Sequence, residues 1–142
     1  MARDHAPPRR PAELGPAEAL RLLAGVTFGR LVFTREALPS VRPVGHLLDD
    51  GDIVIRTHEG AGLTPHGEGS DGRGVVVAYE ADCIDAVTHL GWSVVVVGYA
   101  RLVTDADEIA RVRARLEAWE PWHDAEQVAR IHPELITGFR ID

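Results

Sequence analysis

The residues best suited to chemistry in this sequence are an arginine and a threonine at the end of a predicted strand. Arg56 and Thr57 close the run 53–57 and precede the segment 58–74, in which six of 17 residues are glycine. A guanidinium, a hydroxyl and loop N–H groups together can hold a phosphate dianion. Neighbouring residues of a strand point to opposite faces, so an ordinary strand end is the competing interpretation. Arg42, on the preceding predicted strand, is a further side chain that can converge there.

The basic residues are informative as well, because all 15 are arginine and the sequence has no lysine. Schiff-base catalysis by lysine is therefore excluded, and a bound phosphate must be held by arginine, hydroxyl or backbone groups. The seven histidines show no His-x-x-x-His spacing and the single cysteine has no second cysteine to pair with, so no metal site is predicted. The Gly-x-Ser-x-Gly motif of serine hydrolases is also missing.

Composition and charge favour one globular domain and argue against nucleic acids and anionic membranes as partners. Of the 142 residues, 45% are hydrophobic, and the net charge is −7, which disfavours general binding to nucleic acids or anionic membranes. The sequence has no run of 18 apolar residues that could span a membrane. We expect residues 1–14 to form a flexible tail without the apolar core of a signal peptide, and residues 15–142 to form the domain. The single Cys83 excludes an internal disulfide and fits a reducing compartment, so a cytoplasmic location is expected.

The elements that must position these residues are mostly strands. Apolar and β-branched runs predict six of them, over residues 28–35, 41–48, 53–57, 75–80, 92–103 and 135–141. The fifth is the most apolar and is predicted to be central. Pro43 indicates an edge position or a bulge within the second strand, and Gly98 indicates a bend or bulge within the fifth. The segment 58–74 is expected to be the most mobile part of the chain interior.

Three short helices complete the predicted architecture. The first covers residues 17–24, the second covers 105–118, and Asp124 begins a third that ends near Pro133. Six strands with short helices indicate a mainly β fold, an antiparallel barrel or a sandwich. The apolar fifth strand and the second helix leave surface to bury, which predicts a symmetric homodimer. The apolar stripe on that helix comprises Ile109, Val112, Leu116 and Trp119.

Five segments of the sequence, in this order and at this spacing, resemble one known family. They are residues 29–34, 38–44, 52–57, 91–100 and 130–138. The resemblance is to the pyridoxamine 5′-phosphate oxidase-like proteins with the FMN-binding split-barrel fold, most closely to the small actinobacterial type, and it runs from about residue 17 to residue 141. It implies a six-stranded antiparallel split β-barrel with short helices.

The same resemblance implies a homodimer that binds FMN in clefts between its subunits. Trp92, considered without the family, is equally consistent with an ordinary core residue. His46, beside the segment expected at the ring, is the candidate general acid or base. The residues implied to bind the cofactor are Arg42, Pro43 and Val44 at the edge of the flavin ring, Arg56 and Thr57 at the ribityl phosphate, and Trp92 and Ser93 at the ring.

Two departures from the family pattern keep other functions open. Ala61 and Gly62 replace the Ser-Lys pair that usually holds the phosphate, and Gly45 stands where an asparagine is frequent. The resemblance implies an FMN-dependent oxidoreductase of unknown substrate, and the departures leave two alternatives. One is a non-enzymatic split-barrel protein that has lost flavin and binds another ligand or a partner. The other is a reductase that uses the deazaflavin F420.

Overall fold

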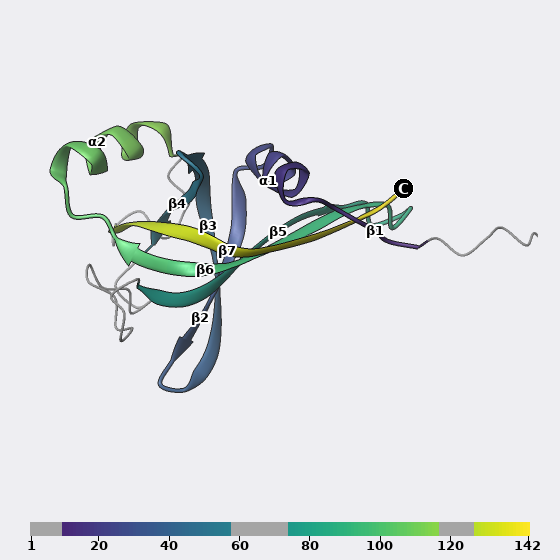
Figure 1. Cartoon of the computed structure of the whole chain (residues 1–142), viewed down its shortest axis with the longest axis horizontal. Helices are drawn as coiled ribbons and strands as arrows, with labels where there is room; N and C mark the ends of the chain where they lie inside the picture. The colour runs from purple at the N-terminus through teal and green to yellow at the C-terminus, as the bar shows by residue number, and fades with distance from the viewer. Residues whose placement is uncertain (1–9, 58–73, 117–126) are drawn as a thin grey trace, which may run out of the picture.

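The computed structural model of the protein describes residues 10–57, 74–116 and 127–142, which form strands and two helices (Figure 1). The predicted mobile segment 58–74 falls outside this part of the chain except for Gly74. In chain order the elements are β1 (Ala12–Glu13), α1 (Pro16–Ala24), β2 (Phe28–Arg35), β3 (Leu38–Asp49), β4 (Asp52–Thr57), β5 (Val75–Ile84), β6 (Gly91–Leu102), α2 (Ala106–Arg115) and β7 (Gln127–Ile141).

The strands form one antiparallel sheet that closes on itself. Their order is β1-β7-β4-β3-β2-β5-β6, and a further pairing of β6 with β7 closes the ring. The apolar β6 pairs with a neighbour on each side over almost its whole length, so its predicted central position is confirmed. The mainly β barrel with short helices confirms the predicted fold class.

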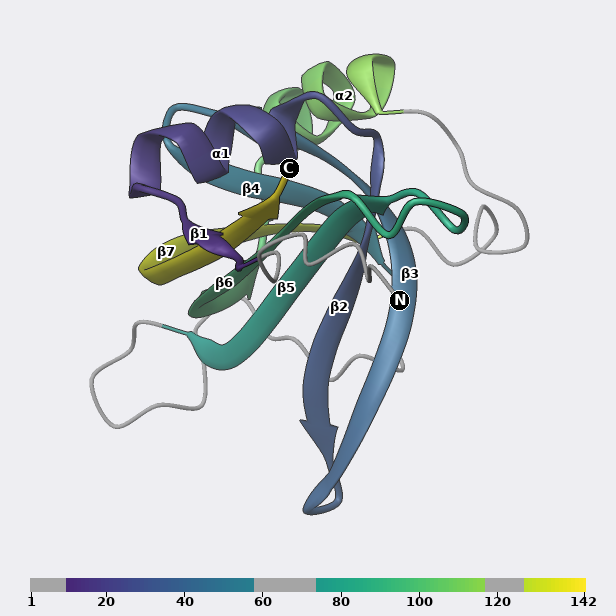
Figure 2. The ribbon, with the colours of Figure 1, turned by 90° about the vertical axis from the view of Figure 1, so that its right-hand side faces the viewer.

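The β2–β3 hairpin extends beyond the closed part of the barrel (Figure 2). Its tight turn places Glu36 and Ala37 at positive φ, 51° and 65°, which matches the twist of the two strands. Residues 38–45 of β3 pair with β2, whereas the pairing with β4 begins only at His46. Among the described strands, Pro43 therefore lies in the half of β3 that pairs with β2 alone, and its predicted edge position is confirmed.

The sequence interpretation of residues 124–131 as a helix is wrong. Residues 124–126 lie outside the described part of the chain, but β7 begins at Gln127 and continues through Ile131, paired with β4. Pro133 is accommodated because Gly98 lies opposite it and Val97 lies opposite Leu135, which leaves one extra residue in β7. This is a β-bulge, where a strand tolerates proline. The irregularity predicted at Gly98 is thus present, although the extra residue belongs to β7 rather than to the strand of Gly98. The predicted last strand is longer than expected.

The chain joins the sheet earlier than the expected tail boundary at residue 14. Ala12 and Glu13 pair with Arg140 and Phe139 of β7, and the side chain of Leu14 is buried. A strand of two residues is too short to show an alternating pattern, which is why the sequence did not reveal β1.

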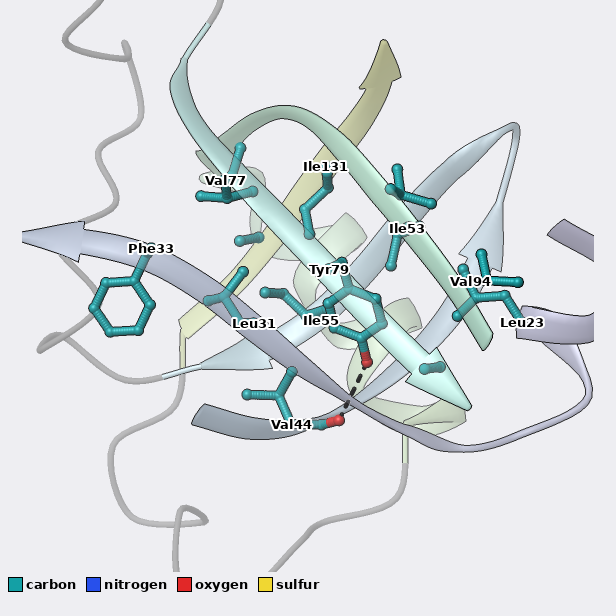
Figure 3. Close-up of a cluster of buried hydrophobic side chains, with 14 of the residues drawn as sticks. Leu23, Leu31, Phe33, Val44, Ile53, Ile55, Val77, Tyr79, Val94 and Ile131 are labelled. Atoms are coloured by element: carbon teal, nitrogen blue, oxygen red, sulfur yellow. Dashed lines mark hydrogen bonds between the residues drawn. The ribbon is translucent and has the colours of Figure 1, made fainter. Parts of the chain in front are cut away.

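Two apolar clusters hold the fold together. The larger one fills the barrel, as Figure 3 shows for part of it, and includes Ala19 and Leu23 of α1. The smaller one packs Val112 and Leu116 of the α2 region on Val54, so this part of the predicted helical stripe is confirmed. Ile109 packs against the second cluster, and Trp119 lies outside the described residues.

An ion-pair network also fastens α2 to the sheet. Arg130 of β7 lies between Asp49 of β3, Asp52 of β4 and Glu108 of α2, and its Nε is 2.6 Å from Glu108 Oε1. The Asp49 carboxylate, hydrogen-bonded by Arg111 and Arg130, has its pKa lowered to about 2. Neither described helix is long and apolar enough to cross a membrane.

Candidate functional site

The end of β4 carries a buried hydroxyl without a partner. Thr57 is 1% exposed and points into the barrel, on the same face of the strand as Ile53 and Ile55. Among the described residues its Oγ1 has no hydrogen-bond partner. Leaving a buried polar group unsatisfied costs about 1–3 kcal/mol, so this hydroxyl is suited to a polar group supplied by a ligand.

Arg56 leaves β4 on the opposite face, which α2 covers. Burial lowers the pKa of Arg56, and the positive charge of Arg113 on α2 lowers it further. Two guanidinium groups so placed create a positive potential that favours an anion. Because Arg56 and Thr57 leave the strand in opposite directions, a group at the end of β4 is what both can reach. The role predicted for Arg56 and Thr57 at a phosphate stays a prediction.

A second buried polar group lies directly opposite Thr57. Gln127, the first residue of β7, is its register partner, and the Oε1 atom of Gln127 is buried without a hydrogen-bond partner. Within the described ranges these are the two side-chain atoms left in this state. Sequence reasoning missed Gln127 because it assigned that segment to a helix, where the residue would not face Thr57.

The predicted ring-edge residues 42–44 occupy three different environments. Arg42 is half-buried, Pro43 is exposed on the outer face of the sheet, and Val44 is buried in the core. The Tyr79 hydroxyl lies 3.3 Å from the carbonyl oxygen of Val44, as the dashed line in Figure 3 shows. Of this segment, Pro43 and Arg42 are thus the residues with surface available to a ligand.

Trp92 and Ser93 lie at the other end of the barrel, at the start of β6. Trp92 packs against the main core, which supports its interpretation as a core residue. Ser93 points to the outer face, and with Phe139 it lines a hollow of about 70 Å³. Trp92 pairs with Arg140, thirteen residues along β7 from Gln127, the partner of Thr57. That is on the order of 40 Å of strand, so one chain does not bring the two predicted parts of the site together.

His46 is part of the core rather than a free acid or base. Its Nε2 lies 2.8 Å from the Leu23 carbonyl oxygen, which can only accept, so Nε2 carries the proton. Its Nδ1 then accepts from the Tyr79 hydroxyl at 2.5 Å. Burial lowers the pKa of His46, so the ring stays neutral. With both nitrogens engaged and 5% exposure, His46 holds α1 to the barrel.

A charged cluster that the sequence analysis did not predict lies between Pro43 and Ser93 on the outer face of the sheet. Nη1 of Arg30 is 2.9 Å from Oε1 of Glu80 and 3.3 Å from Oδ2 of Asp82. Arg30 is the register partner of both Pro43 and Glu80, and Asp82 is the partner of Ser93. Partial burial, followed by the neighbouring Asp82, raises the pKa of Glu80 to about 7.

A closed antiparallel barrel with a projecting β2–β3 hairpin and short helices packed against it defines the split-barrel class. The chain belongs to the pyridoxamine 5′-phosphate oxidase family, whose sequence profile matches residues 15–140. The family predicted from the five sequence segments is thereby confirmed.

Similar proteins match the chain over almost its full length. It is 47% identical over 133 residues to an uncharacterized protein of Mycobacterium tuberculosis, covering 94% of this chain and 87% of that one. A crystal structure from Corynebacterium glutamicum, of a protein assigned to the pyridoxamine 5′-phosphate oxidases, has a TM-score of 0.73 and 32% identity over 96% of this chain and 97% of that one. An FAD-binding protein of Mycobacterium smegmatis has a TM-score of 0.66 and 28% identity, covering 91% and 96%.

Proposed function

We propose that this chain is an FMN-binding flavoprotein that acts as an oxidoreductase in the cytoplasm. The observation that carries the proposal is the buried, unpartnered hydroxyl of Thr57 beside Arg56 at the end of β4. A phosphate there would accept a hydrogen bond from the hydroxyl and could pair with the guanidinium. The FAD-binding relative supports flavin as the class of cofactor. Bound flavin supplies hydride transfer, and this chain's residues supply its position and electrostatic surroundings.

The active assembly in this proposal is a homodimer with the cofactor between its subunits. Within one chain, Thr57 of β4 pairs with the start of β7, whereas Ser93 of β6 pairs with Phe139 near its end. If both contact one flavin, they must come from different copies. A two-fold axis would then form two equivalent sites, each with Arg56 and Thr57 from one subunit and Ser93 from its partner.

The test compares flavin binding and stability in Thr57→Val. Removing an unsatisfied buried hydroxyl with little change in shape should raise the ligand-free stability by roughly 1 kcal/mol. The same change should weaken FMN binding about tenfold, because the phosphate loses a donor. Flavin fluorescence titration and urea unfolding measure the two effects. Thr34→Val, at an exposed position of β2, is the matched control and should change neither.

Arg56→Ala provides the larger effect on binding. Loss of a charge-assisted contact costs about 1.5–3 kcal/mol, which corresponds to roughly tenfold to a hundredfold weaker FMN binding. Arg21→Ala, a highly exposed arginine of α1, serves as control.

Titrations with FAD and with F420 run in parallel with FMN. Equal FMN affinities of wild type and Arg56→Ala would remove Arg56 from the site. Tighter binding of FAD or F420 than of FMN would identify that molecule, rather than FMN, as the cofactor. Failure of wild type to bind any of the three would contradict the proposal and favour the flavin-free ligand-binding alternative.

A further inference from the structure

The outer face of the barrel carries an apolar row that crosses five strands. Register pairing places its members side by side from β3 through β2, β5 and β6 to β7. Its two ends are well exposed, Val41 at 59% and Leu135 at 58%. Burying such a row against another surface is favourable. The row comprises Val41, Val32, Ala78, Val97 and Leu135.

The Arg30–Glu80–Asp82 cluster lies next to this row on the same face. One nitrogen, Nη1 of Arg30, serves both carboxylates. The neighbouring strand β6 presents Val95 and Ser93 opposite Glu80 and Asp82, and neither of these carries a charge. With both carboxylates ionised the cluster has a net charge of −1.

We propose that proton uptake by the Glu80–Asp82 pair controls the association of two copies of this chain through this face. The inference rests on the proposed homodimer. A two-fold interface uses the same patch of each subunit, so it contains two of these clusters, each with the same net charge. Burying uncompensated negative charge against apolar side chains is costly. One proton on each pair removes that cost.

The direction of the pH effect follows from this geometry. Glu80 already titrates near neutral pH in the single chain, with a pKa of about 7, and further desolvation in the dimer raises that pKa. The dimer therefore binds more protons than two separate chains, and it weakens as pH rises above about 7. With one carboxyl pair per subunit, the dissociation constant rises by up to roughly a hundredfold per pH unit, the limit for two protons.

The experiment measures the dimer dissociation constant of the full chain between pH 6 and pH 8.5. Fluorescence-detected sedimentation over a dilution series gives the constant, and exchange between differently labelled subunits gives the dissociation rate. We expect the wild-type constant to rise at least tenfold over this range and exchange to accelerate. Glu80→Gln, which mimics the protonated carboxyl, should give a tight and pH-independent dimer. Asp107→Asn on α2, away from the sheet face, should behave like wild type.

A second variant tests whether the excess charge of the pair, rather than Glu80 alone, weakens the dimer. Asp82→Asn leaves ionised Glu80 paired with Arg30, a cluster without net charge, so this dimer should also stay tight across the pH range. A wild-type dimer whose constant and exchange rate do not change with pH, or a Glu80→Gln dimer that weakens as the wild type does, would overturn the inference and leave the homodimer standing. A monomer at every pH and concentration would instead overturn the homodimer, and the inference with it.

Discussion

Tyr79 and Glu80 are neighbours on β5, but their side chains point to opposite faces of the strand and have different roles. Tyr79 is fully buried, with His46 and the Val44 carbonyl at its hydroxyl, and burial raises its pKa far above its usual range. Glu80 shares one guanidinium with Asp82, and its pKa rises only to about 7. Burial acts on both side chains. Tyr79 is a fixed part of the core because its hydroxyl has hydrogen-bond partners. Glu80 responds to pH because it and Asp82 share a single guanidinium.

The strongest test of this contrast removes each side chain. Tyr79→Ala deletes a large buried ring and should lower the free energy of unfolding by about 3–5 kcal/mol. Glu80→Gln keeps the volume on the outer face and should cost little stability at pH 5, where the carboxyl is also protonated. Urea unfolding at pH 5 compares the two. If Tyr79→Ala were as stable as Glu80→Gln, the buried Tyr79 side chain would not be needed for stability.

A subtler change removes only the hydroxyl of Tyr79. Tyr79→Phe keeps the ring beside Gly29, whose missing Cβ leaves room for it, but Nδ1 of His46 loses its donor. An unsatisfied buried acceptor costs about 1–3 kcal/mol. The His46 ring protons should also exchange faster, which NMR can measure. Unchanged stability together with unchanged exchange would contradict the hydrogen-bonded role given to His46.

The smallest expected effect is the pH dependence of unfolding. The pKa of Glu80 is raised from 4.5 to about 7 in the folded chain. The stability it contributes is therefore fully present below about pH 4.5 and is lost as pH rises through about 7. Glu80→Gln should remove this slope. Unfolding curves recorded at intervals from pH 4.5 to 8, at one protein concentration, test it, and identical slopes in both proteins would count against the pKa shift.

The loss of stability at low pH has a different cause, and it serves as an internal reference for the effect of Glu80. The Asp49 pKa is lowered from 3.8 to about 2 by Arg111 and Arg130, so its contribution is lost as pH falls through that range. Glu80→Gln should leave this loss of stability at low pH unchanged.

Most of the fold could be predicted because its signals are local. Alternation and β-branched runs identified the strands around Phe33 and Val96, and Pro16 and Gly25 bounded the first helix as they bound α1. The start of β7 was missed because Pro133 indicates a helix end when the opposite strand is unknown. Only the pairing with Gly98 shows that a bulge accommodates this proline.

The candidate site could be predicted only where its residues are adjacent in the sequence. Arg56 and Thr57 form such a pair, and the structure places them at a strand end. The partners Gln127 and Arg30 belong to other strands, and strand register, which a single sequence does not encode locally, brings them together with Thr57 and Glu80. His46 was misjudged because a histidine near an expected ligand has the same sequence pattern as a histidine that serves the core.

Among the described strands, half of β3 pairs with β2 alone, and this half also bears on how the protein behaves at high concentration. An extended strand with an unpaired edge is a template on which strands of other molecules can add, the first step of aggregation. Pro39 and Pro43 lie in this half, and neither has an N–H to offer to an incoming strand. The projecting hairpin can therefore remain accessible without promoting uncontrolled growth of intermolecular sheets.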